Sequence, residues 1–91
     1  MALSKEDAVK RARQDLAQRL GVAEDEIKEE AIESADFPDM ALGAPVEDEM
    51  SAQMIASGWR IRLASKGQSY EYRANRDGLR LYNYKGSNYR L

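Results

Sequence analysis

Three short runs between residues 57 and 82 alternate apolar with polar side chains, and turn residues separate them. A period of two residues places successive side chains on opposite faces of a β-strand. The separating segments, residues 65–68 and 75–78, contain the Gly, Asn and Asp residues that hairpin turns prefer. We therefore predict an antiparallel meander with one apolar face, made of seven side chains: Trp59, Ile61, Leu63, Tyr70, Tyr72, Leu79 and Leu81.

A longer apolar period near the start of the chain predicts a helix that covers this face. Its apolar residues recur at intervals of three or four positions: Val9, Ala12, Leu16 and Leu20. Ser4 suits an N-cap, and Gly21 suits the left-handed residue that ends many helices, so we predict a helix over residues 5–20. The expected fold is α+β, with this N-terminal helix packed on an antiparallel meander of three to five strands. Because 91 residues leave room for one core, residues 1–91 are expected to form a single domain.

Two segments leave alternatives open. Residues 28–37 alternate apolar and polar side chains as a strand does, while their glutamates favour a helix. We choose the strand because Pro38 and its neighbours interrupt the segment early. A Lys-Gly pair at residues 85–86 repeats the pair at residues 66–67. It marks either an unrelated turn or a final hairpin with an edge strand at residues 89–91.

The absence of His and Cys excludes most catalytic chemistries. His is the commonest general base, and Cys supplies the thiolate nucleophile and, with His, the usual zinc ligands. No Ser-x-x-Lys spacing and no glycine-rich phosphate loop occurs in the sequence. The acids at positions 47–49 lack the spacing of a Ca²⁺ loop. We expect a chain that is not an enzyme, with no catalytic residue, no cofactor and no metal site.

The hydropathy pattern predicts no contact with a membrane. No apolar run reaches the roughly 20 residues that a membrane span requires. The first residues are charged from Lys5 onward and contain no apolar signal core. A cytoplasmic location is therefore expected.

Formal charge is unevenly distributed along the chain. Residues 1–20 carry five bases and three acids, a net charge of +2. Residues 21–56 carry eleven acids and one base, a net charge of −10. Residues 57–91 carry eight bases and two acids, a net charge of +6. Such asymmetry within one small domain indicates either a charged partner or segments that neutralise each other.

The polar positions of the meander predict a basic surface on the face away from the helix. Its side chains alternate with the core residues: Arg60, Arg62, Arg73, Arg80 and Tyr82. Arginine forms bidentate bonds with carboxylates, which suits an acidic protein or peptide partner. A basic sheet with aromatic residues also suits single-stranded nucleic acid. Alternatively, acids on a neighbouring strand neutralise these arginines within the domain: Glu29, Glu30 and Glu33.

The segment from residue 38 to residue 49 is a loop that contains two prolines and provides a second candidate surface. Leu42, Gly43 and Pro45 are its candidate partner-binding residues, because loops of about ten residues in a small domain are often functional. The alternative is that Leu42 plugs the open end of the sheet. Three methionines in and after the loop are expected to fill the core: Met40, Met50 and Met54.

Four motifs resemble the pattern of a small family of uncharacterised bacterial domains. The family pattern is aromatic-Pro-Asp, two small residues, Leu-Gly-Cys-Pro, then Gly-aromatic-x-Ile and Tyr-x-Tyr. Here the motifs read Phe37-Pro38-Asp39, Met40-Ala41-Leu42-Gly43-Ala44-Pro45, Gly58-Trp59-Arg60-Ile61 and Tyr70-Glu71-Tyr72. The helix end at Leu20-Gly21-Val22 also fits, so the resemblance covers roughly residues 5–82.

The resemblance implies a helix packed on an antiparallel sheet, in a cystatin-like or PepSY-like arrangement, and no enzymatic activity. Ala44 stands where the family has Cys, and Arg73 stands where it often has His. No thiol or metal role is therefore carried over to these positions. We expect a non-enzymatic domain that binds a protein or peptide partner, with single-stranded nucleic acid as the alternative ligand.

Overall fold

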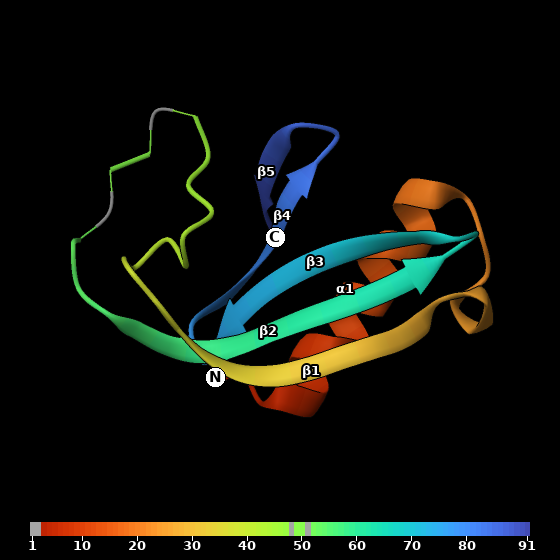
Figure 1. Cartoon of the computed structure of the whole chain (residues 1–91), viewed down its shortest axis with the longest axis horizontal. Coiled ribbons are helices and arrows are strands. Elements are labelled where there is room, and N and C mark those ends of the chain that lie inside the picture. Colours follow the sequence, from red (N-terminus) through yellow and green to blue (C-terminus); the bar gives the residue numbers. More distant parts are fainter. Residues whose placement is uncertain (1–2, 48, 51) are drawn as a thin grey trace.

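A computed structural model describes residues 3–47, 49–50 and 52–91. One long helix, α1 (Lys5–Leu20), lies at the N-terminal end of the chain (Figure 1). The Oγ of Ser4 accepts a hydrogen bond of 3.1 Å from the backbone N–H of Asp7. Gly21 ends the helix with a φ of 68°. The helix and both of its caps confirm the prediction from the sequence.

A single antiparallel sheet follows, with its strands side by side in chain order (Figure 1): β1 (Lys28–Phe37), β2 (Ala56–Ser65), β3 (Gln68–Asn75), β4 (Gly78–Tyr84) and β5 (Ser87–Arg90). A short 3-10 helix, η1 (Glu24–Glu26), precedes β1. The α+β fold is therefore confirmed, with five strands. β1 confirms the strand predicted for residues 28–37. β5 decides between the two alternatives for the second Lys-Gly pair in favour of the final hairpin, and it begins two residues earlier than the edge strand of that alternative.

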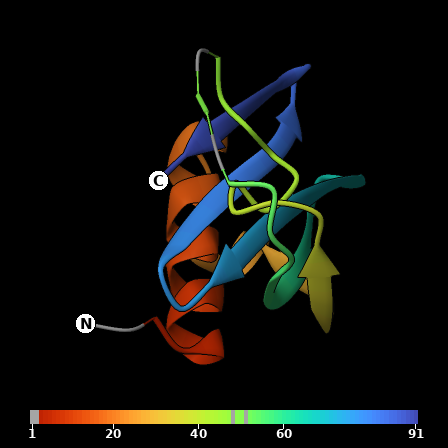
Figure 2. The same cartoon turned by 90° about the vertical axis from the view of Figure 1, so that its left-hand side faces the viewer.

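α1 packs on one face of the sheet and buries its apolar stripe there (Figure 2). Residues on this face pair directly across strands, as Ile61 does with Tyr72 and Tyr72 with Leu81. Trp59 and Tyr70, also predicted for this face, are only partly buried against the core. The largest buried side chains of this core are Leu16, Ile27, Ile61, Leu63, Tyr72, Leu79 and Leu81.

The buried phenol of Tyr72 joins the sheet to the helix. Its hydroxyl donates a hydrogen bond of 2.7 Å to Oδ2 of Asp15, and Nε of Arg19 donates one of 2.6 Å to the same oxygen. Burial and the neighbouring carboxylate raise the pKa of Tyr72 well above its usual range, so the hydroxyl stays protonated and remains a donor. The polar group is therefore satisfied inside the core.

Gly58 lies where β2 passes too close to β3 for a side chain. A Cβ at this position would be 2.0 Å from the carbonyl oxygen of Ala74. We expect Gly58→Ala to lower the free energy of unfolding by about 2 kcal/mol, because the strands must separate to admit the methyl group. Gly78→Ala is the matched control, since a Cβ there meets nothing within 4 Å. Equal urea midpoints for the two variants would contradict this close approach.

The connection between β1 and β2, residues 38–55, contributes Leu42 to a second buried cluster, which also contains Phe37 of β1 and Ala56 of β2. The prediction that three methionines fill the core is wrong. Met40, Met50 and Met54 are 40%, 97% and 64% exposed. The reason is that Ala41, Leu42 and Ala44 fill the buried space beneath the connection instead. Backbone carbonyls and one carboxylate, described below, hold the described part of the connection to the sheet.

Candidate partner-binding surfaces

Four arginines lie side by side across β2, β3, β4 and β5 on the sheet face away from α1. Arg60 pairs in register with Arg73, Arg73 with Arg80, and Arg80 with Arg90. We call this row the arginine ladder. Like charges directly opposite each other on neighbouring strands destabilise a sheet. The arginine ladder therefore requires counter-charges within reach.

Glu71 on β3 supplies the first counter-charge. Its carboxylate lies 2.8 Å from Nε of Arg73 and 3.4 Å from nitrogens of both Arg60 and Arg62. The side chains of Arg60 and Arg62 remain 35% and 46% exposed. Of the four arginines predicted as a partner surface, these two are the accessible ones. Glu33 lies opposite Arg60 in register, as the alternative of internal neutralisation requires, but Arg60 bonds to Glu71 instead.

Glu49, from the connection, supplies the second counter-charge. Its Oε2 accepts a hydrogen bond of 2.6 Å from Nη2 of Arg80, and Nη1 of Arg90 lies 3.5 Å away. The hydrogen bonds from Arg80 hold the pKa of Glu49 at about 2, against an ordinary value of 4.5. Arg80 is only 7% exposed. The structure therefore places this predicted surface residue beneath the connection.

Backbone carbonyls of the connection complete the bonding of the arginine ladder. Nη1 of Arg73 donates to the carbonyl oxygens of Leu42 at 3.2 Å and Gly43 at 3.1 Å. Nη1 of Arg80 donates to the carbonyl oxygen of Ala44 at 3.3 Å. The guanidinium of Arg73 also stacks on the half-buried ring of Tyr82, 3.7 Å from its centroid. These contacts clamp the connection onto the sheet.

The three loop residues predicted to contact a partner differ in accessibility. Leu42 is 2% exposed and belongs to the second buried cluster. Gly43 has a φ of 66°, and a Cβ there would be 2.7 Å from Nη1 of Arg73. Pro45 is exposed. The burial of Leu42 favours its role as a plug, and partner binding at this loop stays a prediction.

β1 is an edge strand, and among the described residues no strand pairs with its outer side. It pairs with β2 alone, from Lys28 opposite Ala64 to Phe37 opposite Ala56 (Figure 1). In an antiparallel sheet, alternate residues of an edge strand point their backbone N–H and C=O groups outward. β1 has ten residues, whereas β5 at the other edge has four, so β1 offers the longer open edge.

A shallow groove runs between α1 and β1. Val9 and Ile32 are its apolar residues, and the rim consists of charged side chains that include Lys5, Lys10, Arg13 and Glu29. Nη2 of Arg13 lies 2.6 Å from Oε2 of Glu29. Val9 is 9% exposed and belongs to the core, as the sequence predicted, and the groove itself was not predicted. The sequence did contain a signal for an open edge beside this groove, because the first strand of a meander lies at the edge of its sheet.

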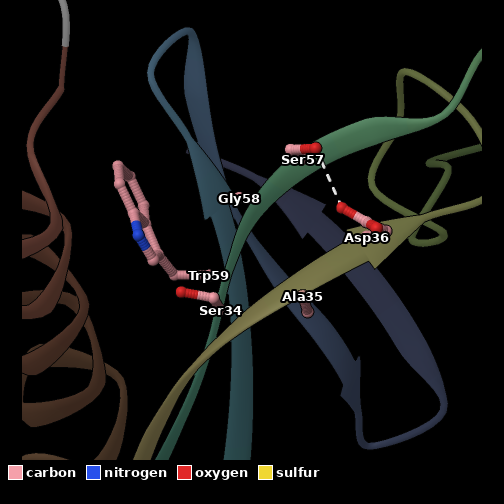
Figure 3. Close-up of a pocket in the computed structure, with 6 residues that line it drawn as sticks. All are labelled: Ser34, Ala35, Asp36, Ser57, Gly58 and Trp59. Carbon is pink, nitrogen blue, oxygen red and sulfur yellow. Dashed lines mark hydrogen bonds between the residues drawn. The ribbon is translucent and has the colours of Figure 1, made fainter.

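A hollow lies toward the end of β1, next to β2 (Figure 3). The Oγ of Ser57 donates a hydrogen bond of 2.8 Å to Oδ1 of Asp36 within it. Trp59 projects from β2 toward the side of the sheet where α1 lies (Figure 3). Hydroxyls, a carboxylate and an indole are therefore within reach of a chain that runs along β1. The lining residues are Ser34, Ala35, Asp36, Ser57, Gly58 and Trp59.

Within the described part of the chain, no three Asp or Glu side chains gather closely enough to hold a metal ion. Asp48, one of the acids at positions 47–49, lies outside that part. In residues 3–47, 49–50 and 52–91, no helix is long and apolar enough to cross a membrane.

The fold and these surfaces define a small α+β domain with one helix on a five-stranded sheet, a clamped connection and an open edge strand. The family model described as Domain of unknown function (DUF8738) matches residues 9–82, and the chain belongs to this family. No curated protein and no solved structure matches the chain. The cystatin-like or PepSY-like relationship and the bacterial origin stay predictions.

Proposed function

We propose that this chain is a non-enzymatic binding domain that holds an extended segment of a protein partner along the open edge of β1. The observation that carries this proposal is a ten-residue edge strand, with outward backbone groups, beside an apolar groove. A strand added to β1 gains main-chain hydrogen bonds, while its alternate side chains enter the groove. The backbone bonds provide affinity and the groove provides specificity.

Two observations support a role without catalysis. The sequence has no His and no Cys. The side chains of Asp15, Glu49 and Glu71 are at most 20% exposed, and their carboxylates bond to Tyr72, Arg80 and Arg73 respectively, so all three serve the packing of the fold. A general acid or base requires a carboxyl group that is free to exchange its proton with a substrate.

Alternate N-methylation of a peptide tests strand addition without changing the protein. The probe is an octapeptide of alternating Val and Thr, made in two forms that carry N-methyl groups on one or the other set of alternate residues. In one form the methyl groups face β1 and block pairing, and in the other they face water. We expect the two forms to differ in affinity by at least about tenfold.

The measurement is the change of backbone amide NMR shifts in β1 and α1 as peptide is added. The unmethylated octapeptide is the reference and should shift amides of β1 first. Equal affinities of the two methylated forms would contradict strand addition, and so would shifts confined to β4 and β5.

Single-stranded nucleic acid is the second candidate ligand and has less support. Arg62 is 46% exposed, whereas Arg73 and Arg80 bond to the connection. A ligand on this face would meet few unpaired guanidinium groups, and affinity for phosphates depends on such charges. We expect a labelled oligothymidine to show no change of fluorescence anisotropy at low salt. Binding that weakens steeply with added salt would support this candidate instead.

A further inference from the structure

Most acids of residues 21–56 form no ion pair within the described chain. Of the eight bases in residues 57–91, five form ion pairs with Glu71 or Glu49. Of the ten described acids in residues 21–56, Glu29 and Glu49 alone form ion pairs. Because two carboxylates serve those five arginines, the arginine-rich face keeps a net positive charge, whereas the unpaired acids give residues 21–56 a negative charge.

These acids gather along β1 and in the turn before it. Glu33 is exposed on the sheet face away from α1, and in the described chain no base forms an ion pair with it. Glu30 lies at the register shift of β1, and Glu24 and Asp25 lie in η1. A strand added to β1 would place side chains about 5 Å from that of Glu33. Opposite charges at this separation attract, so basic side chains are favoured there.

The groove favours a different kind of side chain on the other face of the added strand. Ile32 faces α1, because it pairs with the buried Ile61, and with Val9 it forms the apolar part of the groove. Lys5 and Lys10 on the rim repel a basic residue at this place. An apolar side chain gains contact with Ile32 and Val9 and loses water.

The acids of β1 also oppose pairing with a second copy of the same strand. In an antiparallel pair of two β1 strands centred on Glu33, the Glu33 carboxylates of the two copies would lie directly opposite each other. Like charges across a strand pair destabilise it, which is one way in which proteins protect edge strands. The occupant of the edge is therefore a segment of a different protein.

We propose that the partner segment is an extended strand with basic side chains on the face away from α1, alternating with apolar side chains over the groove. This inference rests on the proposed function and adds the chemistry of the partner to it. The charges of β1 select the basic positions, and Val9 with Ile32 selects the apolar ones.

Four unmethylated octapeptides test this chemistry: Lys alternating with Val, Thr with Val, Glu with Val, and Lys with Ser. We expect the Lys/Val peptide to bind at least about tenfold more tightly than the Glu/Val peptide, with Thr/Val between them. We expect the Lys/Ser peptide to bind about tenfold more weakly than Lys/Val, because it has nothing to place over the groove. Fluorescence anisotropy at constant ionic strength gives the four dissociation constants.

Two matched variants locate the charge effect. Glu33→Lys should remove the preference for Lys/Val over Glu/Val. Asp77→Lys makes the same change of charge in the turn between β3 and β4, two strands away from β1, and should leave the preference within about twofold of wild type. Circular dichroism confirms that both variants fold.

The outcomes separate this inference from the proposed function. Equal affinities of the Lys/Val and Glu/Val peptides overturn the inference. The proposed function still stands in that case if the two N-methylated forms of the Val/Thr octapeptide differ in affinity. An equal loss of preference in Glu33→Lys and Asp77→Lys also overturns the inference, because it shows attraction by net charge alone. Equal affinities of the two N-methylated forms of the Val/Thr octapeptide overturn the proposed function itself.

Discussion

Leu16→Ala should lower the free energy of unfolding by about 4 kcal/mol, the largest effect that we expect from any single substitution in this chain. Leu16 is 0% exposed and lies in the core that α1 forms with the sheet. Removing its buried methyl groups leaves a cavity between two rigid layers that cannot easily collapse. Folded domains of this size are stable by only about 5–15 kcal/mol, so the variant should approach the limit of stability.

Leu91→Ala is the control, because this substitution removes the same side-chain atoms at a site that is 38% exposed. Its stability should stay within about 1 kcal/mol of wild type. Urea unfolding followed by the fluorescence of Trp59 measures both variants. If Leu16→Ala unfolded at the same urea concentration as wild type, α1 would not pack on the sheet as described.

Glu49→Gln should lower the free energy of unfolding by about 3 kcal/mol. Glu49 neutralises Arg80, and the side chains of the two are 11% and 9% exposed. Removing one member of a buried ion pair leaves the other charge without compensation in a poorly solvated place. Glu47→Gln is the control, because Glu47 is exposed and belongs to no ion pair among the described residues. It should change stability by less than about 0.5 kcal/mol.

A double variant separates the loss of the ion pair between Glu49 and Arg80 from a general loss of packing. Replacing both residues, as Glu49→Leu with Arg80→Met, should recover most of the lost stability, because apolar side chains of similar volume can substitute for a buried ion pair. If the double variant were less stable than Glu49→Gln, the carbonyl contacts of Arg80 would be the dominant contribution instead of the ion pair.

The pH dependence of stability follows from the pKa of Glu49. The folded value of about 2 lies below the ordinary value of 4.5, which the group has in the unfolded chain. The stabilisation is therefore fully present above about pH 4.5 and is lost as the pH falls toward 2. The stability difference between wild type and Glu49→Gln should shrink over that interval. A difference that is the same at pH 7 and pH 2.5 would contradict the depressed pKa.

Local patterns in the sequence predicted the strands and their faces correctly. The alternation from Trp59 to Leu63 places Ile61 under the helix and Arg60 and Arg62 on the other face, because side-chain direction in a strand depends only on position along it. The turns follow in the same way from local residue types. Ser4 and Gly21 similarly mark both ends of α1 through bonds within one turn.

Contacts between distant segments could not be predicted in this way. Glu49 and Arg80 are 31 residues apart, and a run of acids in a loop is equally consistent with full solvation. The path of the connection depends on where the arginine ladder lies, which requires the register of four strands. The prediction that the methionines fill the core failed for the same reason. Their spacing along the sequence carries no information about a segment whose path depends on contacts with distant strands.

The open edge was partly predictable. A meander in chain order makes β1 an edge strand, so its exposure follows from the predicted topology. The groove does not follow, because it depends on how α1 lies across the sheet relative to Ile32. The acids that stay unpaired were also not predictable, because that depends on which carboxylates the arginines bind.

Amide hydrogen exchange along β1 tests the central claim most directly. In the free chain, we expect alternate amides between residues 31 and 36 to exchange rapidly and their neighbours, which bond to β2, to exchange slowly. Saturating Lys/Val octapeptide should slow the rapid set and leave the other set unchanged. Slow exchange at every amide of this stretch in the free chain, or an unchanged pattern with peptide bound, would contradict an open edge that accepts a strand.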